Sequence, residues 1–340
     1  MRVVAGWHAT AAELDTVRRA LGSDVDVVGL PCRDDIVFPY GAEREPYLAA
    51  MADADAVITW TLPPEVVSAA PNLKYVSWLH SGCDRLPFDD FKARGIQLTN
   101  VPEAHQPAIA EHAWSLILAC IKKTVWKHEQ HVAGRYVPYW HDDGVGSVLY
   151  GRTMVLLGVG GIGRRIAAVA KAFGMNVIAV RKNPDLPAEN TDAVYGQERL
   201  HDALALGDVI VVATPSTNRT RDMIDHDAIA AMKPHAYLVN IARGDIVNEK
   251  AIRDALVNNR IAGFASDVWW DYADAMPPDQ HFGSPSRLGV HLLPNVVVSG
   301  DQASNVFFAR DAMLDLGLQN LAAMLAGKQP PHLVDLDAQY

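Results

Sequence analysis

Short apolar runs alternate with amphipathic helical patterns along the first hundred residues. A strand-like run opens the chain at 2–7, and a helical pattern at 10–21 follows it. Further patterns typical of buried strands stand at 25–30, 55–60, 73–79 and 95–101. This rhythm is typical of βαβ units and predicts a mostly parallel sheet.

A long helical pattern interrupts the alternation. It extends from Pro107 to about His131, and an aromatic, glycine-containing stretch at 134–140 and a turn-rich stretch at 141–147 follow it. We interpret the region at about 107–145 as an interdomain helix with a projecting arm.

From residue 153 the alternation restarts with greater clarity. Strand patterns stand at 153–159, 176–180, 208–214, 236–242, 262–268 and 295–300, and a last helical pattern lies at about 306–325. Strand–helix units in this number predict a doubly wound sheet. Because 340 residues exceed what one hydrophobic core usually organises, two domains are expected.

Composition narrows the function classes. The formal net charge of −10 would repel a phosphate backbone, and the basic residues are scattered, so we expect no nucleic-acid partner. The three cysteines stand far apart and form no metal-ligand pattern, which favours a reducing compartment. The N-terminal residues show no signal-peptide pattern, and the most apolar helical pattern, at 114–121, ends at two lysines. These features predict a cytoplasmic protein without a membrane segment or a metal.

The strongest local signal is a glycine-rich turn. Gly158, Gly160 and Gly163 fit the GxGxxG pattern, with a strand pattern before them and an amphipathic helical pattern after them. The first glycine allows the tight turn, the second lets a pyrophosphate approach the backbone, and the third lets the helix pack on the sheet. The helix N-terminus then offers free N–H groups to the anion. The turn therefore predicts a dinucleotide site; the alternative is a structural turn without a ligand.

The residues after the next strand pattern bear on the choice of nucleotide. Arg181 and Lys182 stand where an NAD-binding protein usually carries an acidic residue for the ribose hydroxyls. Because Arg181 would bind a 2′-phosphate that a carboxylate would repel, NADP(H) is favoured and NAD(H) is the second choice. The alternative is that both side chains are solvated loop charges.

Several segments, in family order, resemble the D-isomer-specific 2-hydroxyacid dehydrogenase family. They are the stretches at 81–86, 108–119, 158–163, 213–217, 239–252 and 266–270. The resemblance implies a Rossmann nucleotide-binding domain at 101–304, inserted in a split flavodoxin-like substrate domain formed by 1–100 plus 305–340. It also implies a homodimer built on the long helix and the arm. The helical pattern near 113–121 carries more apolar surface than a monomer would expose, which favours the same assembly.

The resemblance implies functional roles for the residues of this sequence that match the family's substrate and cofactor contacts. It implies that Arg243 binds the substrate carboxylate and carbonyl oxygen, since a planar guanidinium can pair with a carboxylate in bidentate fashion. It implies a substrate-carboxylate loop at Ser81, Gly82 and Cys83, and it places Asp267 beside the nicotinamide amide. A surface ion pair for Arg243 and a turn cap for Asp267 are the alternatives. The remaining implied cofactor contacts are Gly161, Ile162, Thr214, Pro215, Ile241 and Ala242.

Two positions depart from the family pattern. Asp301 stands where the family carries its acid–base His, and Tyr272 replaces the carboxylate that raises the pKa of that His, with Asp271 and Asp274 alongside. Imidazole suits proton transfer at neutral pH, whereas an ordinary Asp titrates near pH ~4 and is a poor acid at pH 7. The proton carrier of the family is therefore missing.

Three interpretations of this departure stand. Asp301 acts itself, with a pKa raised by burial or by a neighbouring carboxylate, on an altered substrate. Alternatively another His supplies the proton, and the candidates are His105 in the segment at 102–112 and His80 and His281 in expected rim loops. In the third interpretation ordinary 2-hydroxyacid chemistry is lost, and the protein binds nucleotide as a sensor or uses it for a different reaction.

The segment at 268–283 is rich in aromatic residues. These residues either line an enlarged substrate pocket or serve packing, and both interpretations stay open. For Tyr136, Tyr139 and Trp140 of the arm, packing in a dimer is expected. The sequence as a whole predicts an NAD(P)-dependent oxidoreductase for a small 2-oxo or 2-hydroxy carboxylate, with a proton donor other than His. The alternative is a nucleotide-binding protein of the same fold without dehydrogenase turnover.

Overall fold

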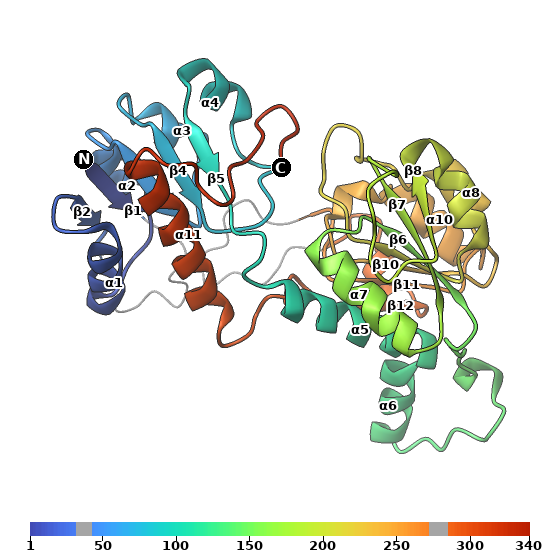
Figure 1. The fold of residues 1–340 in the computed structure, drawn as a ribbon. Coiled ribbons are helices and arrows are strands. Elements are labelled where there is room, and N and C mark those ends of the chain that lie inside the picture. Colours follow the sequence, from blue (N-terminus) through green and yellow to red (C-terminus); the bar gives the residue numbers. More distant parts are fainter. Residues whose placement is uncertain (32–42, 272–284) are drawn as a thin grey trace. The chain divides into compact units, whose positions relative to one another are not determined.

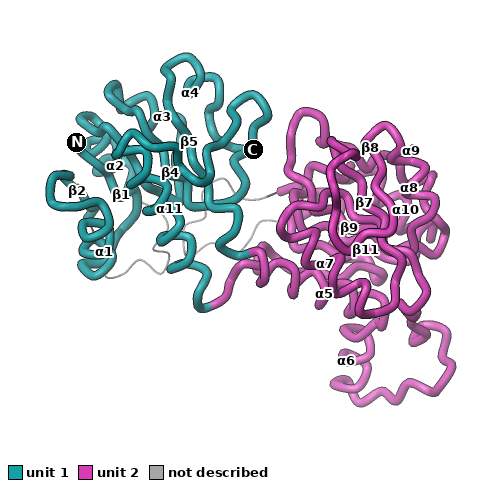
Figure 2. The backbone as a smooth tube through the Cα atoms, viewed as in Figure 1, with its two compact units in different colours: residues 1–105, 277–280, 307–340 teal, residues 106–276, 281–306 magenta. Residues whose placement is uncertain are grey.

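The computed structural model describes residues 1–31, 43–271 and 285–340. This part of the chain forms two compact units, which Figure 2 distinguishes by colour. The first comprises 1–105 and 307–340, and the second comprises 106–271 and 285–306. The sequence-based boundaries, after residues 100 and 304, lie a few residues before those of the units.

The first unit is built on a five-stranded parallel sheet in the order β2-β1-β3-β4-β5 (Figure 1). Its strands are β1 (Arg2–Ala5), β2 (Asp26–Gly29), β3 (Ala56–Thr59), β4 (Tyr75–Trp78) and β5 (Gln97–Thr99). Its helices are α1 (Ala11–Leu21), α2 (Arg44–Met51), α3 (Pro64–Ser68), α4 (Phe88–Arg94) and α11 (Ala309–Leu325). All five strands lie where the apolar runs predict them.

The C-terminal helix α11 belongs to this N-terminal sheet. It contacts α1 and β4, and the hydroxyl of Ser77 in β4 donates a hydrogen bond to the Gly317 carbonyl over 2.9 Å. A Cβ atom at Gly317 would overlap the side chain of Leu79. The helix therefore approaches the sheet so closely that a larger residue at this point would displace the Leu79 side chain.

The second unit carries a seven-stranded sheet in the order β12-β11-β10-β9-β6-β7-β8, with every pair parallel. Its strands are β6 (Thr153–Leu157), β7 (Asn176–Arg181), β8 (Ala193–Gly196), β9 (Val209–Val212), β10 (Tyr237–Asn240), β11 (Gly263–Ser266) and β12 (Val296–Val298). Helices α7 (Gly161–Ala172), α8 (Leu200–Leu206), α9 (His226–Ala231) and α10 (Glu249–Val257) connect them, with short 3-10 turns η2 (Gln197–Arg199), η3 (Gly244–Ile246) and η4 (Val290–Leu292). The prediction of two parallel-sheet α/β domains is confirmed.

The long helical pattern from Pro107 to about His131 corresponds to two helices with a break between them. The segment forms α5 (Gln106–Lys122) and α6 (Thr124–Val132), because Lys123 adopts the left-handed conformation with φ of 53°. Helix α5 packs on α7 and β11, whereas α6 buries none of its residues in the described chain. The arm beyond α6 contains only the turn η1 (Asp142–Gly144) among its regular elements.

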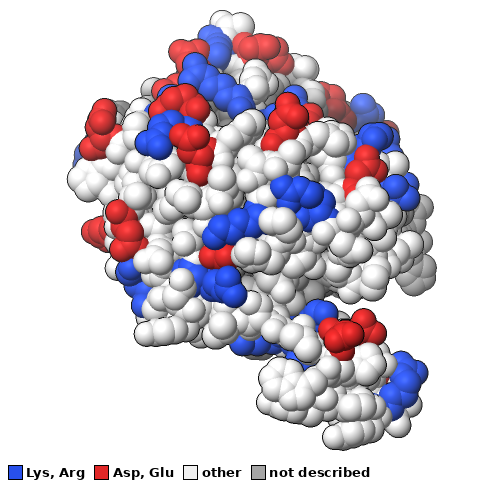
Figure 3. Space-filling view, turned by 90° about the vertical axis from the view of Figure 1, so that its right-hand side faces the viewer, with Lys and Arg blue, Asp and Glu red and all other residues white. Residues whose placement is uncertain are grey.

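Charges of both signs are interspersed on the face that Figure 3 draws. The surface ion pairs of the second unit include Arg199–Asp202 and Lys171–Asp192. Within the described ranges, no helix is long and apolar enough to cross a bilayer, and no group of three acidic, His or Cys side chains could hold a metal ion.

Candidate functional site

The glycine-rich turn joins β6 to α7. Gly158 has φ of 101°, and a Cβ atom there would lie 2.7 Å from the Ala213 carbonyl oxygen at the end of β9. A Cβ atom at Gly163 would overlap the carbonyl oxygen of Gly158, whereas one at Gly160 would meet no atom within 4 Å. Thus Gly158 and Gly163 are required by the fold itself, and Gly160 leaves open space above the N-terminus of α7. This arrangement fits a pyrophosphate, which binds at such a helix start.

The other predicted nucleotide-contact residues stand at the same edge of the sheet. Because all seven strands are parallel, their carboxyl ends lie together. Arg181 ends β7, Thr214 and Pro215 follow β9, and the segment 241–243 follows β10. Asp267 follows β11, and Asp301 lies three residues beyond β12. The sheet thus brings residues from six segments to one edge, which is where ligands of open α/β sheets bind.

The loop that carries Arg243 is held by a residue that the sequence analysis does not single out. Asn240 is fully buried; its Oδ1 accepts the Ala242 N–H over 3.1 Å, and its Nδ2 donates to the Arg243 carbonyl over 2.8 Å. A Cβ atom at Gly244 would overlap the Trp269 carbonyl, so this backbone packs directly against the segment after β11. Arg243 itself is half-buried, and its Nη1 donates to the Ala242 carbonyl over 2.8 Å. The backbone that carries the guanidinium is therefore held in place at the sheet edge.

Asp267 clamps the loop that carries Asp301. The Asp267 side chain is almost completely buried, and its two oxygens accept the N–H groups of Gln302 and Ala303, each over 3.0 Å. The Asp301 N–H donates to the Asp267 carbonyl over 2.7 Å, and Asp301 has the left-handed φ of 55°. Asp tolerates this conformation better than most residues. These bonds are those of a turn cap, the alternative that the sequence leaves open for Asp267.

His112 in α5 is a site residue that sequence reasoning missed. Its Nε2 lies 2.9 Å from the Ser299 hydroxyl and 3.3 Å from Oδ1 of Asp267. Both contacts use the same ring nitrogen, so the three side chains do not form a Ser–His–Asp triad, in which the carboxylate and the hydroxyl occupy opposite nitrogens. Instead, His112 ties α5 to the two loops that hold Asp301.

The first unit brings Ser81 and His105 together. The Ser81 hydroxyl lies 2.9 Å from Nε2 of the buried His105, and it also donates to the Val101 carbonyl over 3.3 Å. Asn100 Nδ2 donates to the Ser81 carbonyl over 2.8 Å. Serine and histidine therefore form a hydrogen-bonded pair at the carboxyl edge of the five-stranded sheet.

The neighbouring loop residues have backbone and ring contacts within the first unit. Trp78 Nε1 donates to the Gly82 carbonyl over 2.8 Å, and the Cys83 side chain is buried. His80 Nε2 lies 3.1 Å from the Trp60 carbonyl, and its ring packs beside Trp78 with centroids 4.9 Å apart.

The described part of the aromatic segment contains Trp269, Trp270 and Asp271, and each of them has contacts within the second unit. Trp269 is buried, its Nε1 donates to the Ser299 carbonyl over 2.6 Å, and its ring lies edge-on to Trp270. Trp270 Nε1 donates to the Val247 carbonyl over 2.6 Å. Asp271 pairs with Arg287 over 2.9 Å. The candidate residues Tyr272, Asp274 and His281 lie outside the described residues.

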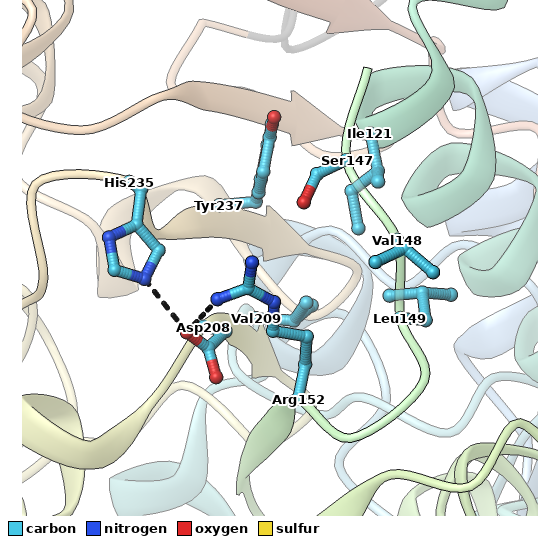
Figure 4. A pocket seen from close by; sticks show the side chains of 9 residues that line it. All are labelled: Ile121, Ser147, Val148, Leu149, Arg152, Asp208, Val209, His235 and Tyr237. Atoms are coloured by element: carbon cyan, nitrogen blue, oxygen red, sulfur yellow. Dashed lines mark hydrogen bonds and ion pairs between the residues drawn. The ribbon is translucent and has the colours of Figure 1, made fainter.

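A small pocket lies at the opposite, amino edge of the seven-stranded sheet (Figure 4). Its lining residues are Ile121, Ser147, Val148, Leu149, Arg152, Asp208, Val209, His235 and Tyr237, and no predicted site residue is among them. Asp208 accepts the Thr153 N–H over 2.8 Å and contacts His235 and Lys233. Burial alone would raise the pKa of Asp208, but these three partners lower it below its ordinary value. Asp208 and its partners thus connect the starts of β6, β9 and β10 to one another.

The glycine turn gives a test that separates binding from folding. We expect Gly160→Ala to keep the melting temperature of the wild type and to weaken NADPH binding about tenfold, the size of one lost charge-assisted hydrogen bond. Gly163→Ala is the matched control, because its methyl group meets the Gly158 backbone and should cost about 1–3 kcal/mol of stability. Thermal unfolding and calorimetric titration measure the two effects. Unchanged NADPH affinity in Gly160→Ala would contradict a pyrophosphate at this turn.

Comparison with known proteins agrees with this geometry. The family model described as D-isomer specific 2-hydroxyacid dehydrogenase, NAD binding domain, matches residues 114–299, more than half of the chain. The glyoxylate reductase of Pyrococcus furiosus is 34% identical over 301 residues, which cover 86% of this chain and 85% of that protein.

Two solved structures extend the comparison to the whole chain. An NADPH-dependent glyoxylate/hydroxypyruvate reductase from Sinorhizobium meliloti, in complex with NADP and malonate, has a TM-score of 0.76 at 25% identity and covers 99% of this chain and 97% of its own. An acyclic imino acid reductase in complex with NADPH and D-Arg has a TM-score of 0.80 at 22% identity, covering 98% and 100%, which shows a shared fold. On the family match and the identity to the curated relative, the chain belongs to the D-isomer-specific 2-hydroxyacid dehydrogenase family.

Proposed function

We propose that the protein is an NAD(P)-dependent oxidoreductase that interconverts a small 2-oxo acid and its 2-hydroxy acid with a proton donor other than His. The observation that carries this proposal is the common edge of one parallel sheet, where the glycine turn and Arg243 follow β6 and β10. The similarity to a glyoxylate reductase supports a small carboxylate as the substrate.

The residues at this edge have separate proposed roles in binding the cofactor, binding the substrate and proton transfer. Gly160 and the first turn of α7 would hold the pyrophosphate, and the bound nicotinamide supplies or accepts a hydride. Arg243 would pair with the substrate carboxylate and stabilise charge on the neighbouring oxygen. Asp301 occupies the acid–base position in this proposal, on a loop that Asp267 and His112 hold in place.

Consumption of NADPH by the purified protein tests the proposal. Glyoxylate, pyruvate and hydroxypyruvate are supplied in turn, and the absorbance of the reduced nicotinamide is followed. Reduction of at least one 2-oxo acid is expected. If the protein binds NADPH but oxidises it with none of a broad panel of 2-oxo acids, the 2-oxo acid function is overturned, and the competing function, a nucleotide-binding protein of the same fold that is a sensor or uses the nucleotide for a different reaction, replaces it.

Arg181 carries the proposed preference for NADP(H). It is half-buried at the end of β7, and its Nη1 donates to the Pro187 carbonyl over 3.3 Å. We expect NADPH to bind several-fold more tightly than NADH, because a guanidinium forms charge-assisted bonds with a 2′-phosphate. Arg181→Asp should reverse the order in isothermal titration, while Arg199→Asp, an exposed arginine beyond β8, should leave it unchanged. A wild-type protein that prefers NADH would contradict the assignment.

The arm supports a proposed homodimer. Tyr136, Tyr139 and Trp140 are 79%, 82% and 76% exposed in the single chain, which is unusual for large aromatic side chains. A second copy packed on the arm would cover them. Sedimentation that gives a clean monomer at micromolar concentration would contradict this assembly.

A further inference from the structure

Arg243 and Asp301 emerge from the same level of the sheet. Asn240, Ser266 and Val298 are register partners across β10, β11 and β12. Arg243 lies three residues beyond Asn240, and Asp301 lies three residues beyond Val298. The ends of β10 and β12 are two inter-strand spacings apart, roughly 10 Å. A cationic and an anionic side chain therefore flank the end of β11, at a separation that the two side chains and one small molecule can span.

Asp267 and Asp301 differ in their surroundings. Asp267 is buried, and its oxygens are engaged by two backbone N–H groups and His112. Asp301 is exposed. An exposed carboxylate carries a negative charge at neutral pH and has no proton to give. Asp301 thus suits a positively charged partner better than an oxygen that must be protonated.

Reduction of a carbonyl group needs an acid in the site, whereas reduction of a protonated imine does not. Reduction of a C=O group needs a hydride on carbon and a proton on oxygen, and the proton must come from an acid. A protonated imine already carries its proton on nitrogen. When its carbon accepts a hydride, the C=N π pair becomes the lone pair of the amine nitrogen, and the reduced nicotinamide is oxidised by the same two electrons. The chain need not supply a proton.

We propose that the preferred substrate of this site is a 2-imino acid, reduced to a 2-amino acid, with Arg243 at the carboxylate and Asp301 beside the iminium nitrogen. This proposal rests on the nicotinamide-dependent hydride transfer and on the Arg243–carboxylate contact of the proposed function, and it replaces the 2-oxo acid by a 2-imino acid as the preferred substrate. An opposite charge nearby favours the charged form of a titratable group, so ionised Asp301 increases the fraction of imine that is protonated. Asp301 transfers no proton in this step, and the amine product takes its last proton from water.

Steady-state kinetics with a cyclic imine test the proposal. The probe is Δ1-piperideine-2-carboxylate, a 2-imino acid that needs no added amine, and pyruvate is the matched 2-oxo acid. We expect kcat/KM with NADPH to be about 10²-fold higher for the imine, the lower range of what a missing general acid costs the oxo acid. Asp301→Asn should reduce imine turnover about tenfold, the equivalent of one lost charge pair. Asp202→Asn, which removes an exposed carboxylate from α8, should change neither rate.

Equilibrium binding provides a second readout that does not depend on turnover. In the presence of NADP⁺, racemic alanine, which carries an ammonium group and a carboxylate, should bind more tightly than racemic lactate. Asp301→Asn should remove that preference and leave the NADPH dissociation constant unchanged.

The outcomes separate this proposal from the function on which it rests. Imine reduction that exceeds oxo-acid reduction and depends on Asp301 supports both. Pyruvate reduced as fast as the imine, or imine turnover untouched by Asp301→Asn, overturns the imine assignment and leaves the oxidoreductase function standing. If neither probe is reduced although NADPH binds, the imine assignment is overturned, and the 2-oxo acid panel decides the oxidoreductase function separately.

Discussion

Arg243→Met is expected to lower kcat/KM for the preferred substrate about 10³-fold, with NADPH affinity little changed. The guanidinium is assigned to the substrate carboxylate, and removal of one such charge-stabilising donor typically costs about 10²- to 10³-fold. The loop should keep its shape in the variant, because Asn240 holds it through the backbone groups of Ala242 and Arg243. Steady-state kinetics and calorimetric titration of NADPH measure the two quantities.

Two further variants identify the cause of the loss. Arg243→Lys keeps the charge but loses the planar fork, so an intermediate rate is expected. Arg221→Met removes an exposed arginine that pairs with Asp245 over 3.2 Å, and it should behave like the wild type. Full activity in Arg243→Met would make this arginine a surface ion pair, which is the alternative that the sequence leaves open.

The sheets could be predicted because their central strands are buried on both faces. Val209–Val212 in β9 and Ala56–Thr59 in β3 are buried throughout, so each reads in the sequence as a continuous apolar run. The glycine turn is equally visible, since backbone packing against Ala213 and Gly158 admits no side chain at two of its positions. Local sequence therefore determines both the strand pattern and the turn.

Features with weak local signals were not predicted. Strand β8 is a short edge strand whose first three residues are only half-buried, and its sequence resembles a loop. The break between α5 and α6 depends on a left-handed Lys123, a conformation that lysine rarely adopts and that nothing in the flanking helical pattern indicates.

The support of Asp301 also lay beyond sequence reasoning. His112 and Ser299 are 187 positions apart, and only the fold places the imidazole against the hydroxyl and Asp267. In the sequence His112 reads as one more residue of a helical pattern. The position of Asp301 was visible because the chain around it matches the family without a gap, but its exposure and its hydrogen bond to Asp267 follow only from the fold.

Asp301→His is expected to accelerate the reduction of 2-oxo acids that the natural sequence reduces slowly. With saturating NADPH, the wild type should turn over glyoxylate, pyruvate and hydroxypyruvate about 10²- to 10⁴-fold below the rate expected with a general acid in place. Imidazole at position 301 would supply the missing proton at neutral pH. Recovery should be partial, because Tyr272 provides no carboxylate to stabilise an imidazolium, and the double change Asp301→His with Tyr272→Glu should recover more.

The competing proton carrier is His105, which makes the interpretation of position 301 falsifiable. His105 is buried and hydrogen-bonded to Ser81, so it has the partner that a relocated acid would need. If Asp301 holds the acid–base position, His105→Ala should leave the slow oxo-acid rate unchanged, and only substitutions at 301 should alter it. Fast oxo-acid turnover by the natural sequence, abolished by His105→Ala and indifferent to Asp301→Asn, would show that the proton carrier has moved to the Ser81–His105 pair. Asp301 would then have no part in the acid–base step.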